Sequence, residues 1–459
     1  MIELTEIDEM SSINQTVEYD DEKVSIAWRN LRYEAYPFGI RRIGKGKTIL
    51  RRLNGHLLFN TLNGFLGPSG AGKTTLLNCL NGTLRSGLSN DSELYLNRYY
   101  SNIGYKPIIR FIEQHVHETI IGIMTVGEIL YYAFRFKNSI SMRQKQYSIN
   151  EHIDKIFSEL ILDKAILKRR FDQCSGGEQK RIAIAQELMS LKMPSFLFLD
   201  EPTTGLDSHA ALLMVRCLRN LIDNLSKEYR FTILASIHAP NSDIINLFDK
   251  IYILARNGFC IYSGSPKLLR NNMIDEHLEL DDNNFRTPIE EYMRIACKDI
   301  DDNNVRKLAT KCFTTENEIL RPLIDRMQFL DNGLSIRYKS FNFQDFLFQL
   351  IRMFQLIFIK QIKNRIFTIM VFIILFYFHA SLLDPRMVEP DTCTLFDDPN
   401  QNLLNLTCQD RVHSRFMVDM YFHYQGFAIA FFGFLLTGLS SIVYSELMKI
   451  IDNEHRNGK

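Results

Sequence analysis

A glycine-rich stretch that starts at Gly67 contains the residue types that bind phosphate. It reads Gly-Pro-Ser-Gly-Ala-Gly-Lys-Thr, follows the apolar run Gly64–Leu66 and precedes a helical pattern over Thr75–Leu80, as the phosphate-binding loop G-x-x-x-x-G-K-[ST] requires. Glycines let the backbone curl so that its N–H groups point at a phosphate, and the start of the helix adds positive potential. The sequence therefore predicts a nucleotide-binding loop made of Gly67, Pro68, Ser69, Gly70, Ala71, Gly72, Lys73, Thr74 and Thr75.

An acidic pair downstream fits the same chemistry. Phe196–Leu199 is a buried-strand pattern that ends in Asp200 and Glu201. In nucleotidases with such a loop, the lysine contacts the β- and γ-phosphates, while the loop Ser or Thr and the first acid hold Mg²⁺. We therefore expect Lys73 to contact the phosphates of ATP, and Thr74 and Asp200 to ligate Mg²⁺. Glu201 would then polarise the attacking water. A strand-terminal acidic pair on its own is more often a solvated turn, and the upstream loop reverses that interpretation.

A third motif lies between these two and points to a family. Cys174 to Arg181 reads Cys-Ser-Gly-Gly-Glu-Gln-Lys-Arg and precedes a helical pattern, so the groups at its start form an anion site. Together with the two motifs above, it makes the sequence resemble the nucleotide-binding domain of ATP-binding cassette (ABC) transporters. In that family this signature loop contacts the γ-phosphate held by the opposite subunit. The resemblance implies that role for Ser175, Gly176, Gly177 and Glu178, whereas a Ser-Gly-Gly stretch alone would be an ordinary helix-entry turn.

Further positions match the loops of the same family. Gln114, in Phe-Ile-Glu-Gln, matches the glutamine that helps to ligate Mg²⁺ and senses the membrane domain. Asp207, in Pro-Thr-Thr-Gly-Leu-Asp, matches the loop that crosses the dimer interface, and His238 matches the histidine that contacts the γ-phosphate. The resemblance thus implies Glu201, His238 and Gln114 as catalytic residues. For the adenine ring, Tyr33 or Tyr36 is a stacking candidate, and an exposed strand aromatic is the equal alternative.

The resemblance is most specific for the G subfamily of half-transporters, in which the nucleotide domain precedes the membrane domain. The signature loop, Ile237–Pro240, Leu247–Asp249 and Glu446–Gly458 look like that subfamily's sequence. Four residues depart from its pattern, although none of them removes a catalytic group: Ala239 where Gln is usual, His115 and His117 in a normally acidic stretch, and Cys174 in place of an aliphatic residue. The resemblance implies a dimer of half-transporters that exports or flips a hydrophobic or amphipathic substrate.

The order of apolar runs predicts the fold class and its boundaries. Short apolar runs alternate with helical patterns, which is typical of βα units around a buried sheet. The sequence predicts an α/β P-loop NTPase of the ABC type followed by α-helical transmembrane segments. We expect a polar leader at 1–21, the nucleotide domain at 22–285 and a solvated polar linker at 286–340.

From residue 341 onward, the pattern of apolar and charged residues is typical of a membrane protein. Residues 341–365 carry apolar side chains at helical spacing, which suits a connecting helix at the membrane surface. The eighteen uncharged residues 366–383 and the stretch 416–444 are each long enough to cross a hydrocarbon core of about 30 Å. A buried core helix would explain one such run, but two favour membrane. The basic residues Lys360, Lys363 and Arg365 before the first span place its N-terminal side, with the nucleotide domain, in the cytosol.

The segment 384–415 between the spans is expected on the extracellular or lumenal side. It holds six acidic against three basic residues. It also contains Asn405-Leu-Thr, an acceptor for N-glycosylation, and the cysteines Cys393 and Cys408. We expect a glycan at Asn405 and a Cys393–Cys408 disulfide, against the alternative of a flexible loop with free thiols. Residues 445–459 are expected to form a cytosolic coupling loop.

The net charge and the number of membrane spans bear on the remaining functional classes. The 54 Lys and Arg residues against 53 Asp and Glu give a net charge of +1, so no global field attracts nucleic acid. This disfavours a soluble ABC ATPase that acts on ribosomes or DNA. Half-transporters of this subfamily have six membrane helices, and two are visible here, so we expect a fragment of a longer product. A membrane-tethered regulator that pairs with a full half-transporter is the alternative. The expected partners are a second subunit, membrane lipid and a hydrophobic or amphipathic small-molecule substrate. The expected location is the plasma membrane or an intracellular vesicle membrane.

Overall fold

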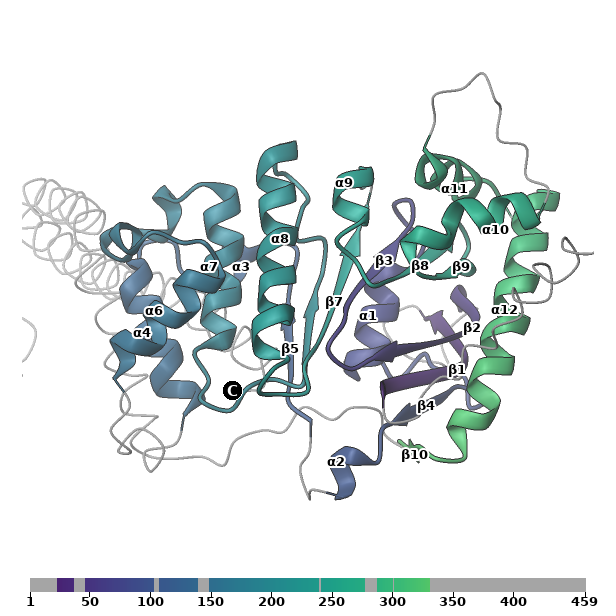
Figure 1. Ribbon diagram of the computed structural model, residues 1–459, viewed down its shortest axis with the longest axis horizontal. Coiled ribbons are helices and arrows are strands. Elements are labelled where there is room, and N and C mark those ends of the chain that lie inside the picture. Colours follow the sequence, from purple (N-terminus) through teal and green to yellow (C-terminus); the bar gives the residue numbers. More distant parts are fainter. Residues whose placement is uncertain are drawn as a thin grey trace, which may run out of the picture. The chain divides into compact units, whose positions relative to one another are not determined.

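A computed structural model describes most of the first 330 residues (Figure 1). The described residues are 23–36, 46–102, 107–138, 148–238, 241–276, 287–299 and 301–330. Several predictions lie outside them: the leader at 1–21, the segments at 341–365, 366–383, 384–415, 416–444 and 445–459, the Asn405 glycan, and the Cys393–Cys408 disulfide. Among the helices of the described ranges, none combines the length and the apolar character needed to cross a bilayer.

A six-stranded sheet forms the centre of the α/β domain. Its strand order is β5-β6-β7-β3-β8-β9, parallel from β5 to β8 and closed by the antiparallel edge strand β9. Every residue of β3, β6, β7 and β8 is buried, which explains why these strands read as continuous apolar runs. The predicted strand Phe196–Leu199 is β6, and the apolar run Gly64–Leu66 lies in β3. The bounds are β3 Leu62–Leu66, β5 Ile109–Ile112, β6 Phe196–Leu199, β7 Thr232–Ile237, β8 Lys250–Ala255 and β9 Phe259–Gly264.

A second, antiparallel sheet packs against the first. Its strand order is β10-β4-β1-β2. Trp28 of β1 joins the two sheets. Its ring lies edge-on to the rings of Phe65 of β3 and Tyr252 of β8, with distances between ring centroids of 6.1 Å and 5.7 Å. The bounds are β1 Val24–Ala35, β2 Lys47–Leu58, β4 Glu93–Leu96 and β10 Gln328–Phe329.

Helices cover the sheets and carry the loops of interest. Helices α4, α6 and α7 pack on one another, and α8 covers β3 and β7 (Figure 1). Ser175 begins α7 and Thr125 begins α4, each through a reciprocal pair of hydrogen bonds with the glutamate three residues on. The bounds are α1 Lys73–Asn81, α2 Tyr99–Asn102, α3 Val116–Thr119, α4 Val126–Lys137, α6 Ile149–Glu159, α7 Gly176–Leu188, α8 Ser208–Leu225, α9 Ser242–Ile245 and α10 Leu269–Asp275.

The expectation of a solvated linker at 286–340 does not hold for its described part. Residues 287–330 contain α11 Pro288–Ala296 and the long helix α12 Asn303–Ile324, which runs beside β1, β2 and β9 (Figure 1). One stripe of α12 is buried at helical spacing: Val305, Leu308, Cys312, Glu316, Leu320 and Leu323. The average polarity of this stretch is high because only one side of the helix packs. That average hides an ordered extension of the nucleotide domain.

Candidate functional site

The glycine-rich loop after β3 has a backbone that other residues would not adopt. Gly67, Gly70 and Gly72 have φ angles of 147°, 77° and 100°, in the region that favours glycine. A Cβ atom at Gly67 would lie 2.3 Å from the carbonyl oxygen of Leu254, and one at Gly72 would lie 2.7 Å from the side chain of Leu50. The loop is therefore shaped by both torsion and space, as expected for a phosphate cradle.

Lys73 is the first residue of α1 and turns back into this loop. Its side chain is 4% exposed, and its Nζ donates hydrogen bonds to the carbonyl oxygens of Gly67 at 2.9 Å and Pro68 at 3.1 Å. The Nζ also lies 3.9 Å from a carboxylate oxygen of Glu201. Burial lowers the pKa of Lys73, while the charges of Glu201 and Asp200 act in the opposite direction. The ammonium group is thus held by weak backbone acceptors that a phosphate can replace.

Asp200 follows β6 and is bonded to the loop and to β7. Its Oδ1 accepts hydrogen bonds from Thr74 Oγ1 at 3.0 Å and from Ser236 Oγ at 2.6 Å. Ser236 Oγ in turn accepts from the backbone N–H of Glu201 at 2.8 Å. The structure therefore brings Thr74 and Asp200 together, as the sequence predicts, and adds Ser236. That serine carries no motif signal, since it sits inside an apolar strand pattern.

Glu201 is held by two side-chain donors on one oxygen. Gln114 Nε2 and Thr204 Oγ1 each donate to Glu201 Oε2 at 2.9 Å. The backbone of Glu201 has a φ of 45°, an uncommon conformation for a residue with a side chain and one that recurs at functional sites. The structure brings together Gln114 and Glu201, two residues that the family resemblance implies as catalytic. Thr204 was missed, although it stands in the quoted Pro-Thr-Thr-Gly stretch.

Lys180 connects the signature helix to this acidic loop. From α7 its Nζ donates to the carbonyl oxygens of Glu201 at 3.1 Å and Thr204 at 2.6 Å. Burial lowers the pKa of Lys180 to about 8, and the charge of Glu201 opposes that shift. Lys180 is part of the signature motif, but the motif alone gives no reason to assign this lysine a role. Its position five residues after Ser175, one and a half helical turns on, is the available signal.

The remaining predicted residues lie on the surface around these groups. Ser175 is exposed and caps α7, since its hydroxyl accepts from the N–H of Glu178 at 3.3 Å. Asp207 is exposed and caps α8, where it accepts from the N–H of Ala210 at 2.8 Å. His238 is exposed at the carboxyl end of β7. Within the described ranges, the side-chain hydrogen bonds of Ser175 and Asp207 stay local to their own helices, so neither is brought to the phosphate loop.

The adenine-stacking candidates differ in environment. Tyr33 is 8% exposed, and a Cβ atom at Gly87 would lie 2.6 Å from its ring. The hydroxyl of Tyr36 donates to Glu34 Oε2 at 2.6 Å. Stacking of either ring on adenine stays a prediction.

The loops with these groups follow four neighbouring strands of the parallel sheet. They come after β3, β5, β6 and β7, at the carboxyl ends where ligands bind in open α/β sheets. The donor set, a threonine hydroxyl, an aspartate carboxylate and a glutamine amide, consists of the hard oxygen ligands that Mg²⁺ prefers. The residues expected to bind phosphate, to ligate Mg²⁺ and to polarise water therefore lie close together.

Comparisons with known proteins found the following similarities. A family model described as ABC transporter matches residues 50–204. ABC transporter G family member 14 of Arabidopsis thaliana is 35% identical over 227 residues, which cover 48% of this chain and 33% of that protein. A probable ATP-dependent permease of Saccharomyces cerevisiae is 31% identical over 267 residues, which cover 58% of this chain and 24% of the permease. Among solved structures, cbiO1 of Clostridium perfringens matches with 19% identity and a TM-score of 0.42, over 55% of this chain and 96% of that one.

The matched region spans a third or less of these two relatives, so their whole-protein activities do not transfer by length alone. What the match does cover is the part that holds the phosphate loop, Gln114, the signature loop and the acidic pair. Further G family members of Arabidopsis thaliana and Dictyostelium discoideum match at 30% to 32% identity. Residues 50–204 therefore match an ABC transporter ATPase domain, and about half of the chain is similar to G family ABC transporters.

Proposed function

We propose that this chain is an ATP-hydrolysing half-transporter that works as a dimer to export or flip a hydrophobic or amphipathic substrate. Lipids, sterols, pigment precursors and xenobiotics are the substrate classes that this includes. The observation that carries the proposal is that Lys73, Asp200 and Glu201 lie together at the carboxyl ends of the parallel strands. Each is held by a separate set of hydrogen bonds. ATP and Mg²⁺ are the ligands that this arrangement fits.

The two carboxylates have different tasks in this proposal. Asp200 already accepts hydrogen bonds from Thr74 and Ser236 on Oδ1, which aims it at a cation site shared with the threonine hydroxyl. When bound there, Mg²⁺ neutralises charge on the phosphates. Glu201 is less buried, with 16% of its side chain exposed. Its Oε2 is fixed by Gln114 and Thr204, which leaves Oε1 to accept a proton from water.

Lys73 and the loop backbone position the phosphates. The ammonium group exchanges the carbonyl oxygens of Gly67 and Pro68 for phosphate oxygens, which are stronger acceptors because they are charged. The glycine conformations leave the loop N–H groups free of Cβ atoms on the side of the ligand. Catalysis then consists mainly of electrostatic positioning of the γ-phosphate and water.

Two subunits share each site in this proposal. Ser175 and Asp207 are exposed and bonded only to their own helices within the described ranges. An exposed helix start with unused N–H groups suits a phosphate presented by a second copy or a related subunit. His238 is exposed after β7, and we assign it as the contact to the γ-phosphate.

The membrane part of the proposal rests on the sequence beyond residue 341 and on the G family relatives. The spans at 366–383 and 416–444 and the coupling loop at 445–459 would transmit closure of the nucleotide domains. The alternative is a membrane-tethered regulator that pairs with a complete half-transporter. A regulator of this kind would hydrolyse ATP or bind it without moving substrate by itself.

Steady-state hydrolysis by the full chain tests the assignment of Glu201. Glu201→Gln should lower ATP turnover by about 10²- to 10⁴-fold, the usual contribution of a general base, while ATP binding persists. Lys73→Ala should weaken binding instead, and Glu228→Gln, in the exposed turn after α8, should change neither. Turnover at the wild-type level in Glu201→Gln would exclude Glu201 as the base.

A mixed dimer tests the sharing of sites. A Lys73→Ala subunit combined with a Ser175→Arg subunit should form one intact composite site and one doubly defective site. Trapping of labelled ATP should then exceed that of either parent homodimer. Trapping no greater than in the parents would contradict sharing, while leaving the role of Glu201 untouched.

A further inference from the structure

A cavity lies away from the ATP site, between β1, β2, β9 and α12. It encloses about 520 Å³ and has none of the phosphate-loop or acidic-loop residues in its lining. Four arginines and two phenylalanines are its most prominent lining residues. We name it the basic pocket and define it by Arg32, Arg51, Arg52, Arg306, Phe259 and Phe313.

The backbone of β2 is distorted so that two consecutive arginines reach the basic pocket. Successive residues of a regular strand point to opposite faces. Here Leu31 and Tyr33 of β1, two residues apart, pair with Leu53 and Leu50, three apart, so β2 has one extra residue. Arg52 takes up the irregularity with a φ of 48°. Because a bulge re-aims side chains, both arginines line the pocket.

Strand β9 forms one wall through Phe259 and Cys260, and the turn before it is fixed by contact with β2. Gly258 has a φ of 75°, and a Cβ atom there would lie 1.8 Å from the carbonyl oxygen of Ile49. The N–H of Arg51 donates to the carbonyl oxygen of Gly258 at 3.0 Å. The wall is therefore built before any ligand arrives, which lowers the cost of binding.

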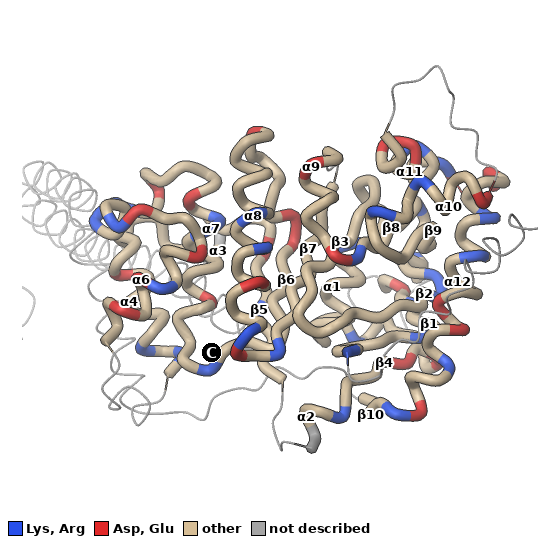
Figure 2. The backbone as a smooth tube through the Cα atoms, viewed as in Figure 1, with Lys and Arg blue, Asp and Glu red and all other residues tan. Residues whose placement is uncertain are grey.

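The arginines are poorly neutralised by the protein. Arg32 is paired with Glu34 at 2.6 Å, whereas Arg306 and Asp301 are 3.9 Å apart, with side chains 64% and 94% exposed. Within the described ranges, no carboxylate contacts Arg51 or Arg52, and no acidic residue lines the pocket. Figure 2 marks further Lys and Arg residues along α12. Like charges gathered in this way attract an anion.

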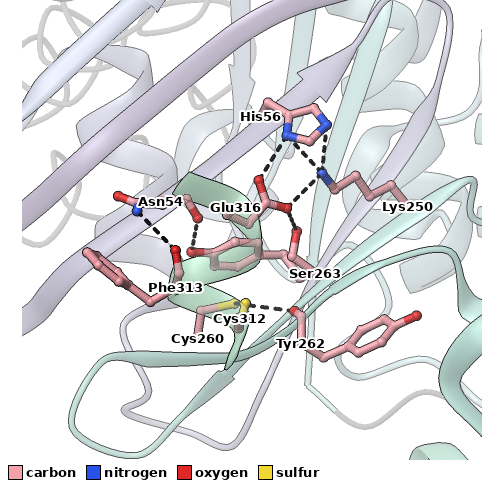
Figure 3. A network of polar contacts seen from close by, with 10 residues as sticks. Asn54, His56, Lys250, Cys260, Tyr262, Ser263, Cys312, Phe313 and Glu316 are labelled. Carbon is pink, nitrogen blue, oxygen red and sulfur yellow. Dashed lines mark hydrogen bonds and ion pairs between the residues drawn. The ribbon is translucent and has the colours of Figure 1, made fainter. Parts of the chain in front are cut away.

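The inner part of the pocket is apolar. Cys260 of β9 and Cys312 of α12 are 7% and 9% exposed, and their Sγ atoms are 3.1 Å apart (Figure 3). Leu53 is buried beside them, while Phe313 is 37% exposed near the opening. The guanidinium of Arg51 lies 5.6 Å from the ring centre of Phe259. An inorganic anion alone would leave these apolar surfaces unused.

We propose that the basic pocket binds a phosphate ester attached to an apolar or aromatic body. Arginine suits phosphate because its planar fork makes two parallel hydrogen bonds to one group. The rings and the buried thiols accept the body, and the volume is in the range of small-molecule sites. A soluble phosphate ester and a phospholipid headgroup with part of its chain share this chemistry. The inference does not depend on ATP hydrolysis by the other site.

Calorimetry with the full chain in phosphatidylcholine nanodiscs tests this pocket. The probe is 1-naphthyl phosphate, added to the Lys73→Ala variant so that the phosphate loop contributes little. The probe should bind, and both 1-naphthol and inorganic phosphate should bind at least about tenfold more weakly, since each lacks half of the recognition. Equal binding of 1-naphthol or of inorganic phosphate would overturn the proposal, as would no binding of the probe.

Substitutions in β2 assign the binding to the arginines. Arg51→Gln combined with Arg52→Asn should weaken the binding of 1-naphthyl phosphate by at least about tenfold. Asparagine is chosen at 52 because it tolerates a positive φ, and the thermal midpoint of the variant checks that the fold is kept. Arg216→Gln, on an exposed position of α8, is the matched control and should change nothing. Unchanged affinity in a folded double variant would overturn the proposal.

Arginine footprinting separates the two sources of ligand. Phenylglyoxal modification, followed by peptide mass spectrometry, should be several-fold slower at Arg51 and Arg52 with the probe present, while Arg216 serves as the internal standard. Replacing part of the phosphatidylcholine by phosphatidic acid gives the lipid arm without probe. Protection in that arm supports a headgroup, and protection by the soluble probe alone supports a soluble ester. Protection in neither arm would overturn the proposal.

Discussion

Two clusters of charged side chains lie in the nucleotide domain and differ in how completely they are satisfied. The site cluster consists of Lys73, Asp200 and Glu201, whose lysine is bonded to backbone carbonyl oxygens. The clamp cluster consists of His56, Lys250 and Glu316, which bond mainly to one another (Figure 3). The first cluster has partners that a ligand can exchange, and the second is closed. The contrast shows how similar residue types serve turnover in one place and architecture in the other.

The clamp cluster holds α12 against the strands. Glu316 Oε2 is 2.9 Å from His56 Nδ1 on β2, and Glu316 Oε1 accepts from Lys250 Nζ on β8 at 3.2 Å. Ser263 of β9 also donates to Glu316. Burial alone would raise the pKa of Glu316, but Lys250 and His56 lower it to about 2. The carboxylate is therefore charged and fully partnered, with its side chain 3% exposed.

Removing the carboxylate from the clamp cluster should have the largest effect on stability. Glu316→Ala leaves Lys250 buried without its anionic partner, which typically costs about 3–5 kcal/mol. We expect that loss in the free energy of unfolding measured with denaturant. Glu318→Ala, two residues along on the exposed side of α12, is the control and should stay within about 0.5 kcal/mol of wild type.

The same variant tests the separation of the two clusters. ATP turnover per folded molecule should be preserved in Glu316→Ala at low temperature, since β7 and β3 separate β8 from β6 and its acidic loop. A variant as stable as wild type would show that the buried network does not hold α12. A folded variant without turnover would show that the two clusters are coupled.

Acid should open the clamp cluster in a defined pH window. The folded pKa of Glu316 is about 2, below its ordinary value of 4.5. A lowered carboxylate pKa contributes stability above pH 4.5, and this contribution is lost as pH falls from about 4.5 toward 2. For a shift of this size it amounts to about 3 kcal/mol. Below the ordinary value, unfolding free energy should therefore fall more steeply with acid in wild type than in Glu316→Gln.

Other carboxylates also titrate in this range, so the difference between the two proteins is the quantity to measure. Glu34, Glu276 and Asp302 have lowered pKa values too, each through hydrogen bonds at the surface. They are common to wild type and variant and cancel in the difference. Parallel pH profiles for the two proteins would contradict the charged state assigned to Glu316.

The two clusters were also unequally visible in the sequence. The site residues lie in short motifs, such as the phosphate loop or the acidic pair after Phe196–Leu199, whose local pattern predicts their positions. The sheet then brings the motifs together because each follows a parallel strand. Local patterns therefore predicted the loop and the acids, and the family resemblance added Gln114.

The clamp cluster has no such local signature. His56 and Glu316 are 260 residues apart, and each stands alone among unrelated neighbours. Glu316 lies in a stretch polar enough to be taken for a linker, since a single buried stripe contributes little to the average. Ser236 was missed for the opposite reason, because one serine in an apolar strand looks like a tolerated exception. Long-range pairing of single residues is the part that one sequence does not reveal.

One serine in each cluster provides the finest test of the comparison. Ser236 accepts from the backbone of Glu201 and donates to Asp200, and Ser263 donates to Glu316. Each alanine substitution removes a hydrogen bond to a carboxylate and should cost about 1–3 kcal/mol of unfolding free energy. If the clusters have the proposed roles, Ser236→Ala should also lower ATP turnover about tenfold, because the acidic loop loses its anchor to β7. Ser263→Ala should leave turnover per folded molecule unchanged. Measuring both quantities on both variants gives the check: a similar fall in turnover for the two serines would mean that turnover follows stability, and the distinction between an exchangeable and a closed cluster would fail.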